Sequence, residues 1–459
     1  MSNYLNLPEN FKNKIKKYFK DESERFLKMY DYSPLKSIRI NTLKISVENF
    51  LEIFDFKLRN TGISDNGFFI EDKSVSNIGY MPLHHAGAFY VQEASAMAPV
   101  MALDVKKGDK VLDLCAAPGG KSSQIAAYLK GTGLLWSNEV VRSRANILLS
   151  NIERMGVRNA VVSSCSPEVL CKRLSGFFDK VLVDAPCSGE GMFRKNPEAC
   201  KEWSEEHVLS CAKRQKIILD CAKDALKENG ILVYSTCTFS PEENEEVLCD
   251  FLKENDDFEL IDINQSFGRP ALSDYIYQNA DITKARRITP LDGGEGHFVT
   301  KLRKKSFKEC ITKPYKYRND KRGKDKIIDV FKGISSKELS DKIEKIDDKY
   351  LMLPDELPDL KGLNVLRAGV LLAEDKKSRI EPCHAFFMAS SSEDIINKFN
   401  LSDFNGNEFK FLKGEEISVP GSLSGFTAVT LNNKIILGFG KCKNGVLKNK
   451  YPKGLRNKK

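Results

Sequence analysis

Apolar and polar residues follow two alternating patterns along the middle of the chain. Short apolar runs predict buried strands at Lys110–Cys115, Gly133–Asn138, Ala160–Ser164, Lys180–Asp184 and Gly230–Ser235. Between these runs, apolar residues recur at helical spacing, as in Ser122–Leu129, Val141–Met155 and Leu209–Lys227. Strands that alternate with crossover helices form one doubly wound, mostly parallel sheet. We therefore predict an α/β domain over residues 86–303, with an antiparallel strand near its end at 296–302.

The segments on either side of this domain have different patterns. Residues 1–85 combine a Lys-rich helical stretch, Phe11–Met29, with an alternating stretch at 37–43, which predicts a small α+β unit. Residues 304–326 are basic and carry Pro and Tyr, which is typical of a linker. Residues 327–459 become strand-rich toward their end, with a hairpin turn expected at Asn432-Asn433.

Composition indicates a polyanion partner and gives no sign of a membrane span. The 459 residues are 41% hydrophobic and 29% charged, which is ordinary for a globular protein. The net charge of +9 is unevenly spread, because Lys and Arg cluster in 301–326 and 441–459. Such clusters indicate a polyanion partner, or else solubilising charge on a linker and a tail. We expect no membrane span and no secretory leader, since the chain has no long apolar run and no basic-then-apolar N-terminus.

Cysteine usage points away from zinc and disulfides. The chain has twelve cysteines but no Cys-x2-Cys pair, so we predict no metal site. So many free thiols favour a cytosolic protein. Most of them, such as Cys200, Cys211 and Cys221, are interpreted as small apolar filler in helices.

A glycine-rich loop follows the first strand of the predicted sheet. Gly119 and Gly120 would let the backbone approach a ligand closely, although an ordinary tight turn has the same pattern. Glu139 ends the second strand, where such folds bind ribose hydroxyls, and Arg144 lies one helical turn further on and could brace this region. Neither an ATP-binding P-loop nor a dinucleotide fingerprint is present, and S-adenosylmethionine (SAM) fits this loop better.

Two cysteines directly follow predicted strands. Cys187 lies in Asp184-Ala185-Pro186-Cys187, and Cys237 lies in Ser235-Thr236-Cys237. Strand ends of a parallel sheet carry its chemistry. A thiolate that adds to carbon 6 of cytosine makes carbon 5 nucleophilic, and a second thiol can act as base or release group. An acid at N3 makes carbon 6 more electrophilic, and we assign that task to Asp184.

These segments resemble the RNA cytosine-5 methyltransferases of the Nol1/Nop2/Sun family. The resemblance covers essentially the whole chain, and the segments 188–195, 241–245, 39–44 and 454–456 resemble its bacterial RsmF/YebU branch, which modifies 16S ribosomal RNA. It implies that Cys237 is the nucleophile, that Cys187 helps to release product, and that Lys121 and Asp184 touch the target base. The cofactor contacts that it implies are Cys115, Ala116, Ala117, Pro118, Gly119, Gly120, Lys121, Glu139, Arg144 and Asp184.

One position departs from the family pattern. The family usually carries an acid after the third strand that contacts adenine, whereas Ser166 stands at that position here. A charged contact would become a hydroxyl contact, or backbone groups would replace it. The resemblance also implies a Rossmann-like SAM-dependent methyltransferase sheet and a PUA-like RNA-binding module at the C-terminus.

Several functions remain compatible with these motifs. The leading hypothesis is a SAM-dependent rRNA cytosine-5 methyltransferase whose partner is 16S rRNA or the 30S subunit, with no obligate protein partner. A tRNA methyltransferase and a non-catalytic ribosome assembly factor are the alternatives. DNA methylation is disfavoured, because DNA enzymes attack from the Pro-Cys position. Tyr315 and Tyr317 could stack RNA bases, or they could belong to a solvated linker.

Overall fold

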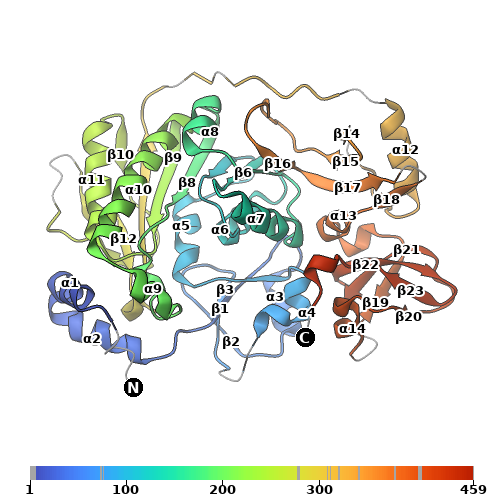
Figure 1. Cartoon of the computed structure of the whole chain (residues 1–459), viewed down its shortest axis with the longest axis horizontal. Helices are drawn as coiled ribbons and strands as arrows, with labels where there is room; N and C mark the ends of the chain where they lie inside the picture. The colour runs from blue at the N-terminus through green and yellow to red at the C-terminus, as the bar shows by residue number, and fades with distance from the viewer. Residues whose placement is uncertain are drawn as a thin grey trace.

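The computed structural model describes most of the chain. It describes residues 7–457 except 73–74, 76, 276–279, 308, 311, 319–320, 340–341, 377–378 and 402–405. The first six residues, on which the expectation of no leader partly rests, lie outside these ranges. Figure 1 shows a central sheet with helices on both faces, a small unit below it and two C-terminal units beside it.

The predicted parallel sheet forms the centre of the molecule. Its parallel strands are β5 (Lys110–Asp113), β6 (Leu134–Asn138), β7 (Ala160–Ser163), β8 (Phe178–Asp184) and β9 (Leu226–Thr236). They lie in the order β7-β6-β5-β8-β9, and β13 (His297–Lys304) pairs antiparallel with β9. Strand interiors such as Leu112, Trp136 and Val181 are fully buried, because helices cover both faces. The α/β fold prediction is therefore confirmed.

Helices cover the two faces of this sheet. They are α5 (Ala98–Leu103), α6 (Gly120–Leu129), α7 (Arg142–Arg154), α8 (Pro167–Arg173), α9 (Pro197–Glu202), α10 (Glu205–Ala225) and α11 (Glu245–Glu254). Three short strands lie toward the β13 end of the sheet: β10 (Phe258–Leu260), β11 (Arg269–Pro270) and β12 (Arg286–Ile288).

The N-terminal unit is an antiparallel sheet with short helices. Its strands are β1 (Ser37–Ile40), β2 (Leu58–Asn60), β3 (Gly67–Ile70) and β4 (Phe89–Val91), in the order β2-β3-β1-β4. Its helices are α3 (Val47–Ile53) and α4 (Pro82–His85). The expected helix over Phe11–Met29 is interrupted into α1 (Glu9–Phe19) and α2 (Ser23–Lys28), because Lys20 adopts a φ of 42°. Both helices pack against Trp203 and Phe239 of the central domain.

The first C-terminal unit extends the central sheet beyond the segment 86–303. β16 (Val365–Ala368) pairs antiparallel with β7 and becomes an edge of that sheet. The rest of this unit is a second small sheet of β14 (Ile343–Ile346), β15 (Lys349–Met352), β17 (Val370–Asp375) and β18 (Ile380–Pro382). Two helices accompany it, α12 (Lys321–Lys332) and α13 (His384–Ala389). α12 begins within the segment expected to be a linker.

The last unit is β-rich, as the sequence predicts. Its strands are β19 (Lys398–Asn400), β20 (Ile417–Ser418), β21 (Gly425–Leu431), β22 (Ile435–Lys443) and β23 (Val446–Asn449), with helix α14 (Asn407–Lys413). Asn432 and Asn433 both have positive φ, at 48° and 56°, as a two-residue hairpin turn requires. The core of this unit is continuous with that of the N-terminal unit, and the Tyr451 hydroxyl lies 2.8 Å from His85 Nδ1.

Candidate functional site

The glycine-rich loop leaves β5 and enters α6 with little space for side chains. Gly119 has a φ of 111°, which L side chains rarely adopt, and a Cβ there would lie 3.1 Å from Leu148 Cδ1. A Cβ on Gly120 would lie 3.2 Å from the Tyr90 ring. A side chain at either glycine would therefore collide with its neighbours, so the loop has to be built of residues without a Cβ.

Asp113, just before this loop, is buried with an unused oxygen. Its Oδ2 accepts a hydrogen bond of 2.7 Å from Ser122, whereas Oδ1 has no partner among the described residues. Burial raises the pKa of Asp113 to about 7, although the Ser122 hydrogen bond lowers it. Burial also raises the pKa of Cys115, so that thiol stays neutral. An orphaned buried oxygen next to the glycine loop fits a polar cofactor.

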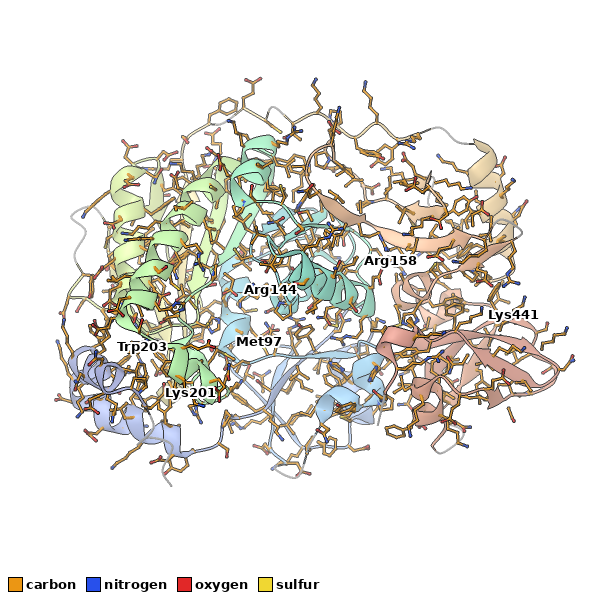
Figure 2. The ribbon with its side chains drawn as sticks, in the orientation of Figure 1. Met97, Arg144, Arg158, Lys201, Trp203 and Lys441 are labelled. Carbon is orange, nitrogen blue, oxygen red and sulfur yellow. The ribbon has the colours of Figure 1, made fainter. Side chains whose placement is uncertain are left out.

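Glu139 and Arg144 form the far wall of the loop. Glu139 is nearly buried, and its Oε1 accepts a hydrogen bond of 3.0 Å from the Val141 N–H. Arg144 Nη1 lies 3.2 Å from Glu139 Oε2, and Nη2 donates to the Ala117 carbonyl at 3.3 Å. Arg144, labelled in Figure 2, therefore braces both the loop and the acid. Ser166 instead caps α8, accepting a hydrogen bond from the Val169 N–H.

The two cysteines meet at the ends of neighbouring strands. Asp184 of β8 is in register with Ser235 of β9, so the segments that follow run side by side. Cys187 Sγ lies 3.0 Å from Cys237 Sγ, and the Cys237 N–H donates to Cys187 Sγ at 3.3 Å. The hydrogen bond with Cys237, burial and the Cys237 charge all raise the pKa of Cys187 well above its usual range. Cys187 therefore keeps its proton in the free protein.

Lys121 and Asp184 form an ion pair in the same site. Lys121 Nζ lies 2.7 Å from Asp184 Oδ2, and Ser235 donates to Asp184 Oδ1 at 2.7 Å. Burial alone would raise the pKa of Asp184, but Lys121, with help from His297 and Ser235, lowers it. Burial would likewise lower the pKa of Lys121, but Asp184 outweighs it and raises that pKa. The carboxylate is ionised, and the proton of the pair lies on Lys121.

A carboxylate that the sequence reasoning did not assign holds the two cysteine loops together. Glu243 accepts hydrogen bonds from the Ser188 N–H at 3.0 Å and from Gln215 Nε2 at 2.7 Å. Burial raises the pKa of Glu243 to about 7, against the lowering effect of its hydrogen bonds. A second carboxylate, Glu190, accepts from the Phe239 N–H at 2.8 Å and from Trp203 Nε1 at 2.9 Å. Both acids lie in the segments 188–195 and 241–245 that carry the family resemblance, and that was their only signal in the sequence.

His297 is a further side chain that the sequence did not single out. It follows the glycine-rich segment 293–296 and begins β13, one residue from the Phe298 and Thr236 pair. Its Nδ1 lies 3.0 Å from Ser95 Oγ. Burial and Lys121 lower the pKa of His297 to about 4, so the ring is neutral.

Among the described residues, neither a metal site nor a membrane-spanning helix is found, and Tyr315 and Tyr317 make contacts that the sequence did not predict. Within the ranges given above, no cluster of His, Cys, Asp and Glu could hold a metal ion, and no helix is long and apolar enough to cross a membrane. Tyr315 donates a hydrogen bond of 2.9 Å to Glu344, and Tyr317 donates one of 2.7 Å to the Pro354 carbonyl. The Tyr315 ring is half-buried and the Tyr317 ring is exposed, and the two meet edge to face, so this segment packs against the first C-terminal unit and leaves one ring accessible to solvent.

The fold and this site define a SAM-dependent methyltransferase. Residues 100–303 match the model of the 16S rRNA methyltransferases RsmB/F, and residues 7–94 match that of the N-terminal domain of 16S rRNA methyltransferase RsmF. Residues 331–389 and 397–457 match the first C-terminal domain and the PUA domain of RsmF. The chain belongs to the RsmF family of rRNA methyltransferases.

Relatives match along nearly the whole chain. Ribosomal RNA small subunit methyltransferase F of Vibrio vulnificus (strain YJ016) is 36% identical over 488 residues, 99% of this chain and 98% of the relative. The protein of the same name from Escherichia fergusonii is 34% identical over 92% of this chain and 90% of its own. A crystal structure of a methyltransferase homolog protein from Pyrococcus horikoshii is 31% identical, with a TM-score of 0.58, over 65% of this chain and 95% of that chain.

Proposed function

We propose that this rRNA methyltransferase acts on carbon 5 of cytosine through a covalent adduct between Cys237 and carbon 6 of the ring. The observation that carries the proposal is the contact between the two sulfurs, 3.0 Å apart, beside the Lys121–Asp184 pair. A ring that needs a nucleophile at carbon 6 and a proton near N3 is matched by a thiol and a charged pair in one site. Because the family acts on rRNA, the pyrimidine that we propose is a cytosine of the rRNA.

The first half of the reaction makes carbon 5 nucleophilic. The Cys237 thiolate adds to carbon 6 and forms the S–C bond, while N3 takes a proton from the Lys121–Asp184 pair. The sequence alone assigned the acid at N3 to Asp184. Its ionisation in the free protein means that the proton comes from the Lys121 ammonium, and Asp184 holds that ammonium in position. The glycine loop, Glu139 and Arg144 would hold SAM, which when bound would supply the methyl group to carbon 5 with S-adenosylhomocysteine as the leaving group.

The second half of the reaction releases the product. The proton on carbon 5 must leave to a base, and its electron pair re-forms the ring double bond as the bond from carbon 6 to Cys237 breaks. The proton on N3 returns to Lys121, which restores the Lys121–Asp184 pair. The main cause of the raised pKa of Cys187 is its hydrogen bond with Cys237. Once Cys237 is bonded to carbon 6, that cause is removed and the pKa of Cys187 falls. Cys187 can then lose its proton and act as the base that drives release.

The substrate that we propose is 16S rRNA, alone or within the 30S subunit. The relatives at 36% and 34% identity are named for the small ribosomal subunit, and the chain carries an RsmF-type PUA domain. The target cytosine has to be unstacked before carbon 6 is exposed to a thiolate. A tRNA substrate would keep the same chemistry.

The deciding experiment is transfer of labelled methyl from SAM to 16S rRNA, 30S subunits and bulk tRNA in parallel, followed by base-level mapping of 5-methylcytosine. Label at a cytosine of 16S rRNA is the expected result. Label only in tRNA would overturn the substrate and keep the mechanism. Absence of label with SAM still bound would make a non-catalytic assembly factor the better description.

A further inference from the structure

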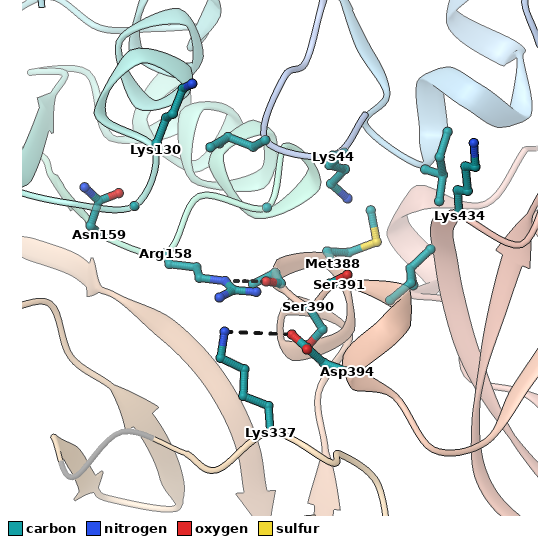
Figure 3. Close-up of a pocket in the computed structure, with 16 residues that line it drawn as sticks. Lys44, Lys130, Arg158, Asn159, Lys337, Met388, Ser390, Ser391, Asp394 and Lys434 are labelled. Atoms are coloured by element: carbon teal, nitrogen blue, oxygen red, sulfur yellow. Dashed lines mark hydrogen bonds and ion pairs between the residues drawn. The ribbon is translucent and has the colours of Figure 1, made fainter. Parts of the chain in front are cut away.

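A cationic hollow lies where four parts of the chain meet. Its volume is about 380 Å³, and it is lined by residues of the N-terminal unit, the central domain and both C-terminal units. We call it the junction pocket. Its charged lining residues are Lys44, Lys130, Arg158, Lys337, Asp394 and Lys434. Figure 3 shows Arg158 and Lys337 next to each other, one coming from the ribbon above and one from the ribbon below, with Lys44 above and to the right; the side chains of Lys130 and Lys434 lie further out and point away from the centre.

The junction pocket is far from the two sulfurs in the architecture of the sheet. Lys130 precedes β6, and Arg158 precedes β7. Cys187 and Cys237 follow β8 and β9. These four strands and β5 all run in the same direction. The pocket therefore lies at the N-terminal ends of the strands, and the two cysteines lie at the C-terminal ends. A group bound there is therefore not the target base or the nucleotide next to it.

The charges in the junction pocket are poorly compensated. Five of the lining side chains are basic and one, Asp394, is acidic. Lys337 Nζ lies 3.9 Å from Asp394 Oδ2, and the same carboxylate also raises the pKa of Arg158 against the lowering effect of burial, so one acid serves two cations. Arg158 instead donates to a neutral oxygen, the Ala389 carbonyl, at 2.5 Å. A neutral acceptor orients a cation without cancelling its charge, which favours an anionic ligand.

Lys44, like Arg158, has a neutral hydrogen-bond acceptor. It donates to the neutral Ala86 carbonyl at 2.8 Å. Burial and the nearby Arg154 lower the pKa of Lys44 to about 7, and burial also lowers the pKa of Arg158. An anion placed among these groups would favour their charged forms, so binding and protonation would support each other.

We propose that the junction pocket binds backbone phosphates of the ribosomal RNA, at a distance from the methylated cytosine. The inference rests on the proposed function, because an RNA substrate is the polyanion that this enzyme meets. Lys and Arg side chains that neutralise phosphates bind RNA without reading its sequence and release counterions. Since the pocket and the thiols lie at opposite ends of the parallel strands, only a long or folded RNA can occupy both. The pocket thereby favours structured rRNA over a short single strand.

The test compares salt dependence of RNA binding in matched variants. Lys130→Ser/Lys337→Ser removes one cation from the rim and one from the wall, and Lys130→Arg/Lys337→Arg keeps both charges. Lys253→Ser on α11 removes an exposed lysine elsewhere. Binding of 16S rRNA is measured at several salt concentrations, and SAM titration checks the fold. We expect the slope of log affinity against log salt to shrink by about one unit for each phosphate that is no longer neutralised.

Two outcomes support the proposal and two overturn it. A reduced slope in the Ser variant, restored in the Arg variant and absent in Lys253→Ser, supports it, as does a KM that rises more for 16S rRNA than for a short cytosine-containing oligonucleotide. A slope equal to that of Lys253→Ser overturns it. Binding of inorganic tripolyphosphate in the pocket with an unchanged RNA slope also overturns it, in favour of a small free anion. Methyl transfer by the wild type is measured separately, so failure of the proposed function is recognised independently.

Discussion

Two neighbouring thiols can act as nucleophile and as base in one reaction only if they lose their protons at different steps. Cys187 holds its proton while Cys237 is free beside it. Cys237→Ala therefore should lower methyl transfer by about a thousandfold or more, because no nucleophile remains for carbon 6. SAM binding should persist, since the glycine loop belongs to β5 and α6. Labelled-methyl transfer and SAM titration measure the two quantities, and substantial turnover by this variant would contradict the role of Cys237.

Removing the partner sulfur should have the opposite kind of effect. In Cys187→Ala the adduct can still form, but no thiolate is left to take the proton from carbon 5. We expect a protein–RNA adduct that survives a denaturing gel and that requires both SAM and a cognate RNA. The double variant Cys187→Ala/Cys237→Ala serves as the control, because it cannot form the bond. An adduct in the double variant, or none in the single one, would exclude the release role.

Lys121 sets the charge of Asp184, and this gives a pH prediction. The pKa of Asp184 is lowered, so the pair is intact at neutral pH and is lost as pH falls through that lowered pKa. In Lys121→Met, burial acts on Asp184 without its main opposing charge, and its pKa rises. Protonated Asp184 is then the only acid left for N3, so the residual rate should rise as pH falls through that raised pKa, with kcat at neutral pH lower by about a hundredfold or more. Lys121→Arg keeps a cation beside Asp184 and should stay closer to the wild-type profile, and a Lys121→Met profile of unchanged shape would contradict the pairing.

At the scale of elements, the segment carrying Glu190 is held against the segment carrying Cys237. The Gly191 N–H donates to the Cys237 carbonyl at 2.9 Å. A Cβ on Gly191 would lie 2.8 Å from the Gly296 oxygen and 3.0 Å from the Cys237 oxygen, and backbone atoms cannot move aside cheaply. Both strand-end segments and the start of β13 therefore meet at one residue that has to be glycine.

Gly191→Ala should consequently displace the nucleophile loop. Overpacking of this kind costs about 1–3 kcal/mol, which urea unfolding can measure. Methyl transfer should fall further than the reduced stability explains, because the sulfur contact depends on this segment. Gly421→Ala is the matched control, since its Cβ would meet open space. Equal stability and activity in the two variants would show that the segment tolerates the displacement.

At the scale of the whole molecule, the family domains share cores and a sheet. β16 from the first C-terminal unit pairs with β7 of the catalytic sheet. The N-terminal unit and the PUA domain bury one continuous cluster that includes Phe50, Phe89, Phe411 and Leu437. The two C-terminal units are thus part of the structure that packs against the catalytic sheet and the N-terminal unit, in addition to any contact with RNA.

Removing residues 327–459 should therefore harm more than RNA binding. The cut exposes the edge of β7 and the apolar face on which the PUA domain packs. We expect a lower midpoint of thermal unfolding and weaker SAM binding together with weaker RNA binding. Calorimetry and SAM titration test this directly. A truncated chain with an unchanged midpoint and unchanged SAM affinity would mean that the catalytic domain is independent of these contacts.

The sequence alone predicted the parallel strands, the loop after β5 and the thiols at two strand ends. These features are local, because an apolar run followed by a glycine or a reactive side chain is visible within a few residues. It also predicted the hairpin at Asn432-Asn433, whose turn depends on two adjacent residues.

Tertiary structure decided how those parts meet. The contact between Cys187 and Cys237 joins residues 50 positions apart, and the roles of Glu243 and His297 depend on neighbours that no local pattern identifies. The same holds for β16 and for the junction pocket, which four separate segments create. Burial and neighbouring charges set the protonation of Asp184, Lys121 and Cys187, and both are properties of the folded molecule.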